Sequence, residues 1–237
     1  MSNLVARLFD PLFRRWMASR LRVHVAGLSQ DPAPDQPLVY CANHLSWWDG
    51  FLVRQLHQQI RPGAPFRAVM LDRELQSRGI LKALGGLGIE PGSLASGRRL
   101  LRTVKALPRD AGVAFFPQGR LRPQDPRPLG FRSGISRVIR ALSPAVVLPI
   151  GIRLLPGKDH RVDAFVSVGT ALPALASDSP NTGQLERAVT RELEAIRAFV
   201  ERFEEDAAQM WPTAAGLLPR NPGALWSGPA ALPFSKN

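Results

Sequence analysis

Two side chains that can move a proton, His44 and Asp49, are separated by only four residues. The apolar run at residues 38–42 precedes them and is typical of a buried strand, whereas residues 48–53 are typical of the start of a helix. A strand-to-helix turn of this length can fold the carboxylate back onto the imidazole. An aspartate that accepts from one ring nitrogen leaves the other nitrogen free to take a proton. The spacing therefore predicts an oriented general base.

The same residues also have simpler interpretations. His44 can be an ordinary loop histidine, and Asp49 can be a carboxylate that the helix dipole favours in a first turn. Ser46 lies between them and could be proposed as a nucleophile, although a serine here also suits a cap for the following helix. Spacing alone leaves these alternatives open.

A second polar turn follows another apolar strand, which is predicted at residues 112–116. In this turn Gly119 allows close approach of a backbone or ligand, and Gln118 offers an amide. Arg120 and Arg122 offer positive charge. A single turn of this kind identifies no function, because Pro and Gly interrupt most loops.

Strands alternate with helices along most of the chain, which indicates an α/β fold with a mixed, largely parallel sheet flanked by helices. With 237 residues, 45% of them hydrophobic, the chain fits one large domain. We expect an N-terminal amphipathic helix in residues 1–20, the domain in residues 21–210, and an irregular Pro, Gly and Ala-rich tail in residues 211–237. Further strands are predicted at residues 22–27, 66–71, 145–150 and 162–168, and helices at residues 74–84, 93–107, 134–142 and 182–210.

Several smaller expectations follow from local patterns. His24 lies in an alternating strand and is expected at the sheet surface, whereas His57 is expected on the solvated side of a helix. The Gly-rich residues 85–90 read as a return loop. Cys41, the only cysteine, is expected to be a small buried filler. One cysteine excludes an internal disulfide and any multi-cysteine zinc site, and we expect no metal.

The formal net charge of +12 comes mainly from arginine, because only four of the 31 basic residues are lysine. Such a surface attracts anions. Nucleic acid, an acidic carrier protein, phosphorylated substrates and anionic lipid all qualify, and charge alone does not rank them. No recognisable nucleic-acid-binding motif is present, so we do not expect a nucleic-acid partner.

Apolar residues recur at helical spacing over residues 4–17, with arginines on the flanks. This pattern suits a helix in the interfacial plane of an anionic membrane, and equally a helix packed on the domain. There is no run of 18 apolar residues and no secretory signal pattern. We therefore expect a cytoplasmic protein that is peripheral on the cytoplasmic membrane face.

Three motifs, taken in order, resemble the glycerolipid acyltransferases of the lysophosphatidate (1-acylglycerol-3-phosphate) acyltransferase type. Residues 43–49 match the family pattern N-H-x4-D, residues 116–119 read F-P-Q-G where the family has F-P-E-G, and residues 148–150 read L-P-I where the family has a late V-P-[IV]. The resemblance covers residues 39–168. Residues 131–134 also resemble the family's basic F-K-x-G element.

Three departures from that family bear on substrate binding. The family commonly has a phosphate-binding arginine after an acidic residue in its second motif, but Glu90 is followed here by Pro91. Gln118 replaces a glutamate, and Arg120 stands where a small Thr or Ser is usual. The resemblance with these departures predicts a lipid acceptor with a free hydroxyl and no phosphate. The alternative is a phosphorylated acceptor such as lysophosphatidate, whose phosphate would be bound from another direction by one of four arginines: Arg98, Arg99, Arg120 or Arg132.

The resemblance implies acyl transfer from a thioester to an alcohol, with His44 as general base oriented by Asp49. It also implies that the substrate alcohol is the nucleophile, which leaves Ser46 as a cap. Substrate contacts are expected from Gln118 and from three residues near it: Gly119, Arg120 and Arg132. The co-substrate would be acyl-CoA or acyl carrier protein, with no other cofactor. The alternative is a catalytically silent lipid-binding protein that keeps the fold.

Overall fold

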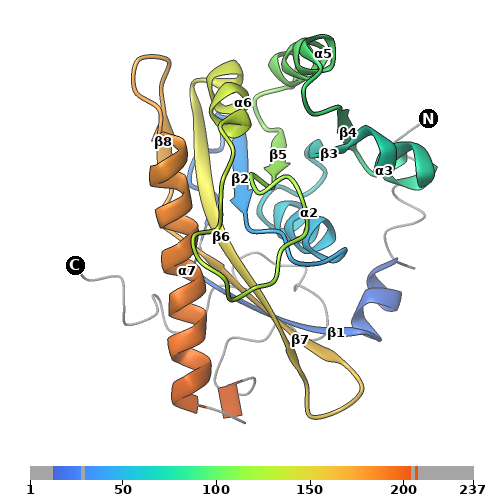
Figure 1. Ribbon diagram of the computed structural model, residues 1–237, viewed down its shortest axis with the longest axis vertical. Coiled ribbons are helices and arrows are strands. Elements are labelled where there is room, and N and C mark those ends of the chain that lie inside the picture. The colour runs from blue at the N-terminus through green and yellow to red at the C-terminus, as the bar shows by residue number, and fades with distance from the viewer. Residues whose placement is uncertain (1–12, 28–29, 204–205, 208–237) are drawn as a thin grey trace.

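The computed structural model of the chain describes residues 13–27, 30–203 and 206–207 (Figure 1). Eight strands form one sheet in the order β1-β7-β6-β2-β5-β3-β4, and β8 pairs with β6 on the side of the main path. The strands are β1 Leu21–Ala26, β2 Leu38–Ala42, β3 Phe66–Leu71, β4 Gly86–Ile89, β5 Gly112–Phe115, β6 Ala145–Pro156, β7 Val162–Val168 and β8 Leu172–Ala174.

Most neighbouring strands run parallel. Only the β6–β7 and β6–β8 pairs are antiparallel, so the sheet is mixed and largely parallel, as the sequence predicts. Helices connect and cover the strands because parallel neighbours need a crossover. The helices are α2 Asp49–Ile60, α3 Asp72–Ser77, α4 Gly79–Ala83, α5 Leu94–Lys105, α6 Gly134–Leu142 and α7 Thr182–Phe203.

Strand β2 lies between β6 and β5, and all five of its residues are buried. Leu38, Tyr40 and Ala42 pack in a core cluster with α2. Val39 and Cys41 pack in a second cluster with α5, α6 and α7. The central strand therefore has helices on both faces, which explains why its sequence is apolar throughout. Cys41 is the buried filler that the sequence predicts.

The N-terminal amphipathic segment is described only from residue 13 onward. Residues 13–18 are helical, and Phe13 and Met17 are buried in the first core cluster. Trp16 on the same helix is 45% exposed. This part of the segment thus packs on the domain. The rest of the segment, and the predicted tail at residues 211–237, lie outside the described residues.

Two predicted elements differ from the structure. The helix predicted at residues 74–84 is two short helices, α3 and α4, and the return predicted at residues 85–90 contains strand β4. The long C-terminal helix is described over Thr182–Phe203, and residues 204–205 and 208–210 of its predicted range lie outside the described residues. In the part of the chain that the structure describes, no helix is both long and apolar enough to cross a membrane.

His24 is buried, so the prediction that it lies on the sheet surface is wrong. Its exposed fraction is 1%, its Nε2 lies 2.7 Å from Asp163 Oδ1, and its ring stacks on Phe165 at 4.7 Å. Both partners come from β7, which pairs with β1. A carboxylate from a strand distant in sequence is what makes burial of this histidine tolerable.

His57 is also fully buried, so its predicted solvation is wrong. The Ala64 carbonyl can only accept, so His57 Nε2 donates to it at 3.3 Å. Nδ1 then accepts from the Tyr40 hydroxyl at 2.9 Å. Burial is the main reason that the pKa of His57 falls from 6.5 to about 4. The imidazole is therefore held neutral at physiological pH.

Acid should destabilise the fold through His57. Unfolded His57 takes up a proton near its ordinary pKa of 6.5, whereas folded His57 resists until about 4. Its contribution to the free energy of unfolding is therefore complete above pH 6.5 and falls as pH decreases toward 4, by on the order of 2 kcal/mol at pH 4.5. Denaturant unfolding at pH 7 and pH 4.5 measures this loss.

The control variant is His57→Gln, whose amide can donate and accept at similar places but does not titrate. Its free energy of unfolding should depend less on pH than that of the wild type. Equal pH dependence in the two proteins would contradict the assignment.

Candidate active site

The first polar turn begins where β2 ends, and Asn43 fixes its position. The Asn43 side chain accepts from Ile152 N at 2.8 Å and donates to Ile152 O at 2.9 Å. The amide thus continues the β2–β6 ladder by one step after the strand backbone has turned away. Sequence reasoning used Asn43 only as a motif letter and missed this contact. A polar residue directly after a buried strand is the signal that could have indicated it.

His44 and Asp49 meet as the spacing predicts. His44 Nδ1 lies 2.9 Å from Asp49 Oδ2, and Asp49 opens helix α2. Because a carboxylate only accepts, Nδ1 must carry the proton, and Nε2 keeps its lone pair. Nε2 has no hydrogen-bond partner among the described residues, and the His44 side chain is 27% exposed. The pair therefore presents one basic nitrogen to whatever occupies this edge of the sheet.

The Asp49 carboxylate has no exposed surface. Its Oδ2 also accepts from the backbone N–H groups of Leu45 at 2.7 Å and Ser46 at 2.9 Å. Its Oδ1 accepts from the Ser46 hydroxyl at 2.6 Å. Four donors compensate the buried charge, which can then stabilise a cationic imidazole.

Ser46 has a role different from a simple helix cap. Its Oγ donates to Asp49 and also accepts from Trp48 N at 3.1 Å, while helix α2 begins with Trp48 as a cap that has no side-chain bond. Ser46 therefore closes the turn and holds the carboxylate. Its hydroxyl proton is directed at Asp49 and away from the basic nitrogen of His44.

The second polar turn clamps His44 from the other side. The His44 N–H donates to Gln118 Oε1 at 2.6 Å, and the His44 carbonyl accepts from Arg122 N at 2.8 Å. The His44 ring stacks on Phe116 with centroids 4.6 Å apart. Parallel pairing of β2 with β5 brings these turns to the same edge, although 74 residues separate His44 from Gln118. The backbone and ring of the histidine are both fixed.

Gln118 is 3% exposed, and both ends of its amide are engaged within the protein. Its Oε1 accepts from His44 N, and its Nε2 donates to the Leu129 carbonyl at 3.2 Å. Sequence reasoning assigned Gln118 to substrate binding. In the structure its amide joins three segments of the chain around His44, a role that the sequence did not indicate.

Gly119 and Arg132 lie beside each other. Gly119 has a φ of +67°, a conformation that favours glycine, and the Arg132 side chain lies 3.6 Å from where a Cβ on Gly119 would be. Arg132 N also donates to the Pro117 carbonyl at 2.9 Å. Arg120 and Arg132 are exposed, and neither has an ion-pair partner among the described residues. They supply positive charge that no described carboxylate compensates, next to the second polar turn.

The described residues contain no group of three or more His, Cys, Asp and Glu side chains arranged to hold a metal ion. The arrangement of His44 and Asp49 suits proton transfer. It can deprotonate an alcohol or another weak acid that reaches Nε2, and it can return that proton to a leaving group.

Gln118→Glu should lower stability and turnover together. A carboxylate at this position can still accept from His44 N, but its other oxygen would face the Leu129 carbonyl with no proton to donate. An unsatisfied buried pair of acceptors costs about 1–3 kcal/mol or more. The melting temperature at pH 8 should therefore fall.

Lowering the pH should reverse part of this loss, since a carboxyl group whose folded pKa is raised regains its proton as pH falls through that pKa. Melting curves of wild type and variant at pH 8 and pH 5 test the sign. If the melting temperature of the variant equals that of the wild type at both pH values, the contact with the Leu129 carbonyl does not determine which residue is tolerated at position 118.

Two comparisons with known proteins bear on this site. A family model described as Acyltransferase matches residues 22–153. The matched stretch runs from β1 into β6, contains both polar turns, and is more than half of the 237-residue chain. A comparison with curated proteins found no match.

Proposed function

Because this chain belongs to the acyltransferase family, we propose that it moves a fatty acyl group from an acyl thioester to a hydroxyl group of a lipid acceptor. The donor is acyl-CoA or an acyl carrier protein. The observation that carries the proposal is the buried, fully bonded Asp49 carboxylate, which orients His44 and leaves Nε2 unbonded among the described residues.

In the proposed reaction, His44 Nε2 removes the hydroxyl proton as the acceptor oxygen attacks the thioester carbonyl. The carbon–sulfur bond then breaks, and the imidazolium returns the proton to the departing thiolate. Asp49 stabilises the positive charge on the ring between these steps. General base catalysis contributes about 10²–10⁴-fold, so fixed orientation of the substrates must contribute as well.

The contacts of Ser46 favour direct transfer to the acceptor over a covalent acyl-enzyme. Its Oγ is bonded to Asp49 and Trp48 N, and it would have to give up both contacts to attack a thioester. A nucleophilic serine also needs its proton directed at the base, which is not the case here. The acceptor hydroxyl therefore fills the role of nucleophile.

Exposed aromatic groups near the catalytic turn support membrane association, which we propose for delivery of the acceptor. Trp47 lies within the turn between His44 and Asp49 and is 37% exposed, and the Arg78 guanidinium lies 4.2 Å from its ring centroid. Trp16 is 45% exposed and contacts Trp48 at 4.9 Å. Tryptophan and arginine side chains suit the interface of an anionic bilayer.

Asp49→Asn should leave the protein folded but remove most turnover, because a neutral amide neither fixes the histidine tautomer nor stabilises the imidazolium. His44→Ala should lose at least as much, and we expect 10²-fold or more in kcat for both. Release of free thiol from a palmitoyl thioester in the presence of lipid extract measures the rate.

Ser46→Ala is the comparison variant for this test. It should keep more activity than either change, since the histidine and the carboxylate both remain. A wild-type rate of thiol release in Asp49→Asn would contradict the proposed mechanism. A wild-type protein that binds lipid but consumes no thioester would favour the silent lipid-binding alternative.

Residues 2–12 should contribute to membrane binding without contributing to chemistry. The deletion stops before Phe13 because Phe13 and Met17 pack in the core. The truncated protein should bind anionic vesicles more weakly, with binding that falls as salt rises, yet turn over a short-chain soluble thioester at the wild-type rate. Vesicle sedimentation measures the affinity. Equal binding by full-length and truncated protein would assign a structural role to the segment.

The acceptor is proposed to be a neutral hydroxyl lipid. Pro91 replaces the arginine that would grip a phosphate, and such charge-assisted bonds are worth about 1.5–3 kcal/mol each. Gln118, whose amide is engaged internally, adds nothing to this argument. A competition between lysophosphatidate and neutral hydroxyl lipids for one labelled thioester should favour the neutral lipids.

The opposite result of that competition would point to Arg120 and Arg132 as a phosphate site. A strong preference for lysophosphatidate that disappears in Arg132→Gln would show that the phosphate site has moved to the second turn. Arg137→Gln, one to two turns further along in helix α6, is the matched control.

A further inference from the structure

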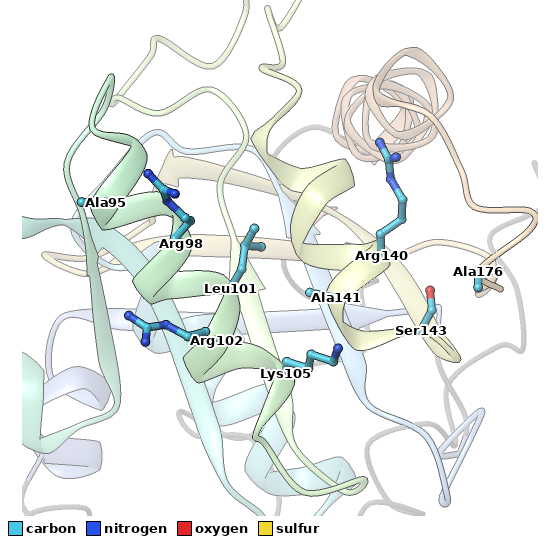
Figure 2. A pocket seen from close by; sticks show the side chains of 9 residues that line it. All are labelled: Ala95, Arg98, Leu101, Arg102, Lys105, Arg140, Ala141, Ser143 and Ala176. Carbon is cyan, nitrogen blue, oxygen red and sulfur yellow. The ribbon is translucent and has the colours of Figure 1, made fainter.

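A groove of about 960 Å³ lies between helices α5 and α6, away from the catalytic pair (Figure 2). Leu101 of α5 and Ala141 of α6 lie between the two helices and form an apolar floor. The Lys105 side chain reaches toward α6, and the arginines of α5 extend outward. The cations that line the groove are Arg98, Arg102, Lys105 and Arg140.

These four cations are uncompensated. Helices α5 and α6 contain no Asp or Glu at all. Among the described residues, none of the four has a carboxylate within salt-bridge distance, whereas Arg99 on another side of α5 pairs with Asp72 at 2.9 Å. Lys105 and Arg140 also suit the negative ends of their helix dipoles, but Arg98 lies in the first half of α5, where a cation gains nothing from the dipole. The helix dipoles therefore do not explain why all four cations lie along this groove.

Helix α5, which forms one wall of the groove, starts at the edge of the sheet where His44 lies. Near the start of α5, Ser96 Oγ accepts from Glu90 N at 2.9 Å, and Arg99 reaches Asp72. Glu90 and Asp72 directly follow β4 and β3 at the same edge where β2 delivers His44. Helix α6 follows Arg132, whose N–H is bonded to Pro117 of the second turn. Both helices therefore begin at the edge that carries the two polar turns and run away from it, and the groove is lined by α5 from Ala95 to Lys105 and by the last turn of α6.

We infer that this groove docks the acidic helical surface of an acyl carrier protein, an inference that rests on the proposed acyl transfer. Arg98, Arg102 and Lys105 recur at i, i+4 and i+7 and span about 10 Å along α5. That spread exceeds what one phosphate can bridge and matches carboxylates along one face of a partner helix. The apolar floor lies in a concave surface, which suits a protruding helix better than a flat bilayer.

Binding can be measured without catalysis, so the first test uses a holo acyl carrier protein titrated against the full chain by calorimetry. Arg102→Glu combined with Lys105→Glu should weaken binding at least tenfold, and raising the salt concentration should weaken wild-type binding as well. Two single changes of the same type, Lys105→Glu and Lys158→Glu, serve as a matched pair. Lys105→Glu should weaken binding of the carrier protein clearly. Lys158→Glu, an exposed lysine in the β6–β7 hairpin with 52% side-chain exposure, should change it less than twofold.

The second test compares one acyl chain on three donors: acyl carrier protein, CoA and a short synthetic thiol. The double variant Arg102→Glu with Lys105→Glu, called the groove variant, should have a KM at least tenfold higher for the carrier-protein donor. Its kcat/KM for the synthetic thioester should be unchanged. If the wild type transfers the acyl chain from none of the three donors, the proposed acyl transfer is wrong. The titration would still test whether the groove binds the carrier protein.

Three results would overturn the inference. The first is no binding of carrier protein to the wild type, and the second is equal binding by wild type and groove variant. The third is a groove variant that loses affinity for anionic vesicles or duplex DNA while it keeps its affinity for the carrier protein.

Discussion

Burial of the Asp49 carboxylate is the constraint on which the active-site turn depends. A carboxylate with no exposed surface must find donors within the protein, and Asp49 finds all four between His44 and Ser46. The backbone has to curl tightly around the carboxylate to bring two N–H groups, a hydroxyl and an imidazole to the same two oxygens. The histidine is therefore oriented by the same contacts that make the buried charge tolerable.

The position of His44 also depends on contacts with parts of the chain that are far from that turn in sequence. Asn43 is bonded to β6, and the two backbone groups of His44 are bonded to the loop after β5. Because β2 lies between β5 and β6, it can receive support from both neighbours at its carboxyl end. This is the place where ligands bind in open α/β sheets. The central position of β2 thus explains both its apolar sequence and its role in the site.

The sequence predicted the parts of the structure that local patterns determine. The five residues of β2 are apolar because both faces are covered, and the His44–Asp49 contact spans one turn, so both were accessible to pattern reasoning. His24 and His57 were placed wrongly because what buries them is not local. Asp163 lies 139 residues from His24, and the Tyr40 hydroxyl that bonds His57 belongs to strand β2, 17 residues away. The internal hydrogen bonds of Gln118 could not be predicted for the same reason, since its partners come from two other segments.

The bond between Asn43 and Ile152 has a consequence for synthesis of the chain. Residue 43 leaves the ribosome more than a hundred residues before its partner, so the nascent chain carries His44 for most of translation without the β6 contact that fixes the turn. The Gln118 clamp also arrives late. A partly made chain that ends before β6 therefore carries His44 and Asp49 without the Asn43–Ile152 bonds that hold this turn in the folded protein.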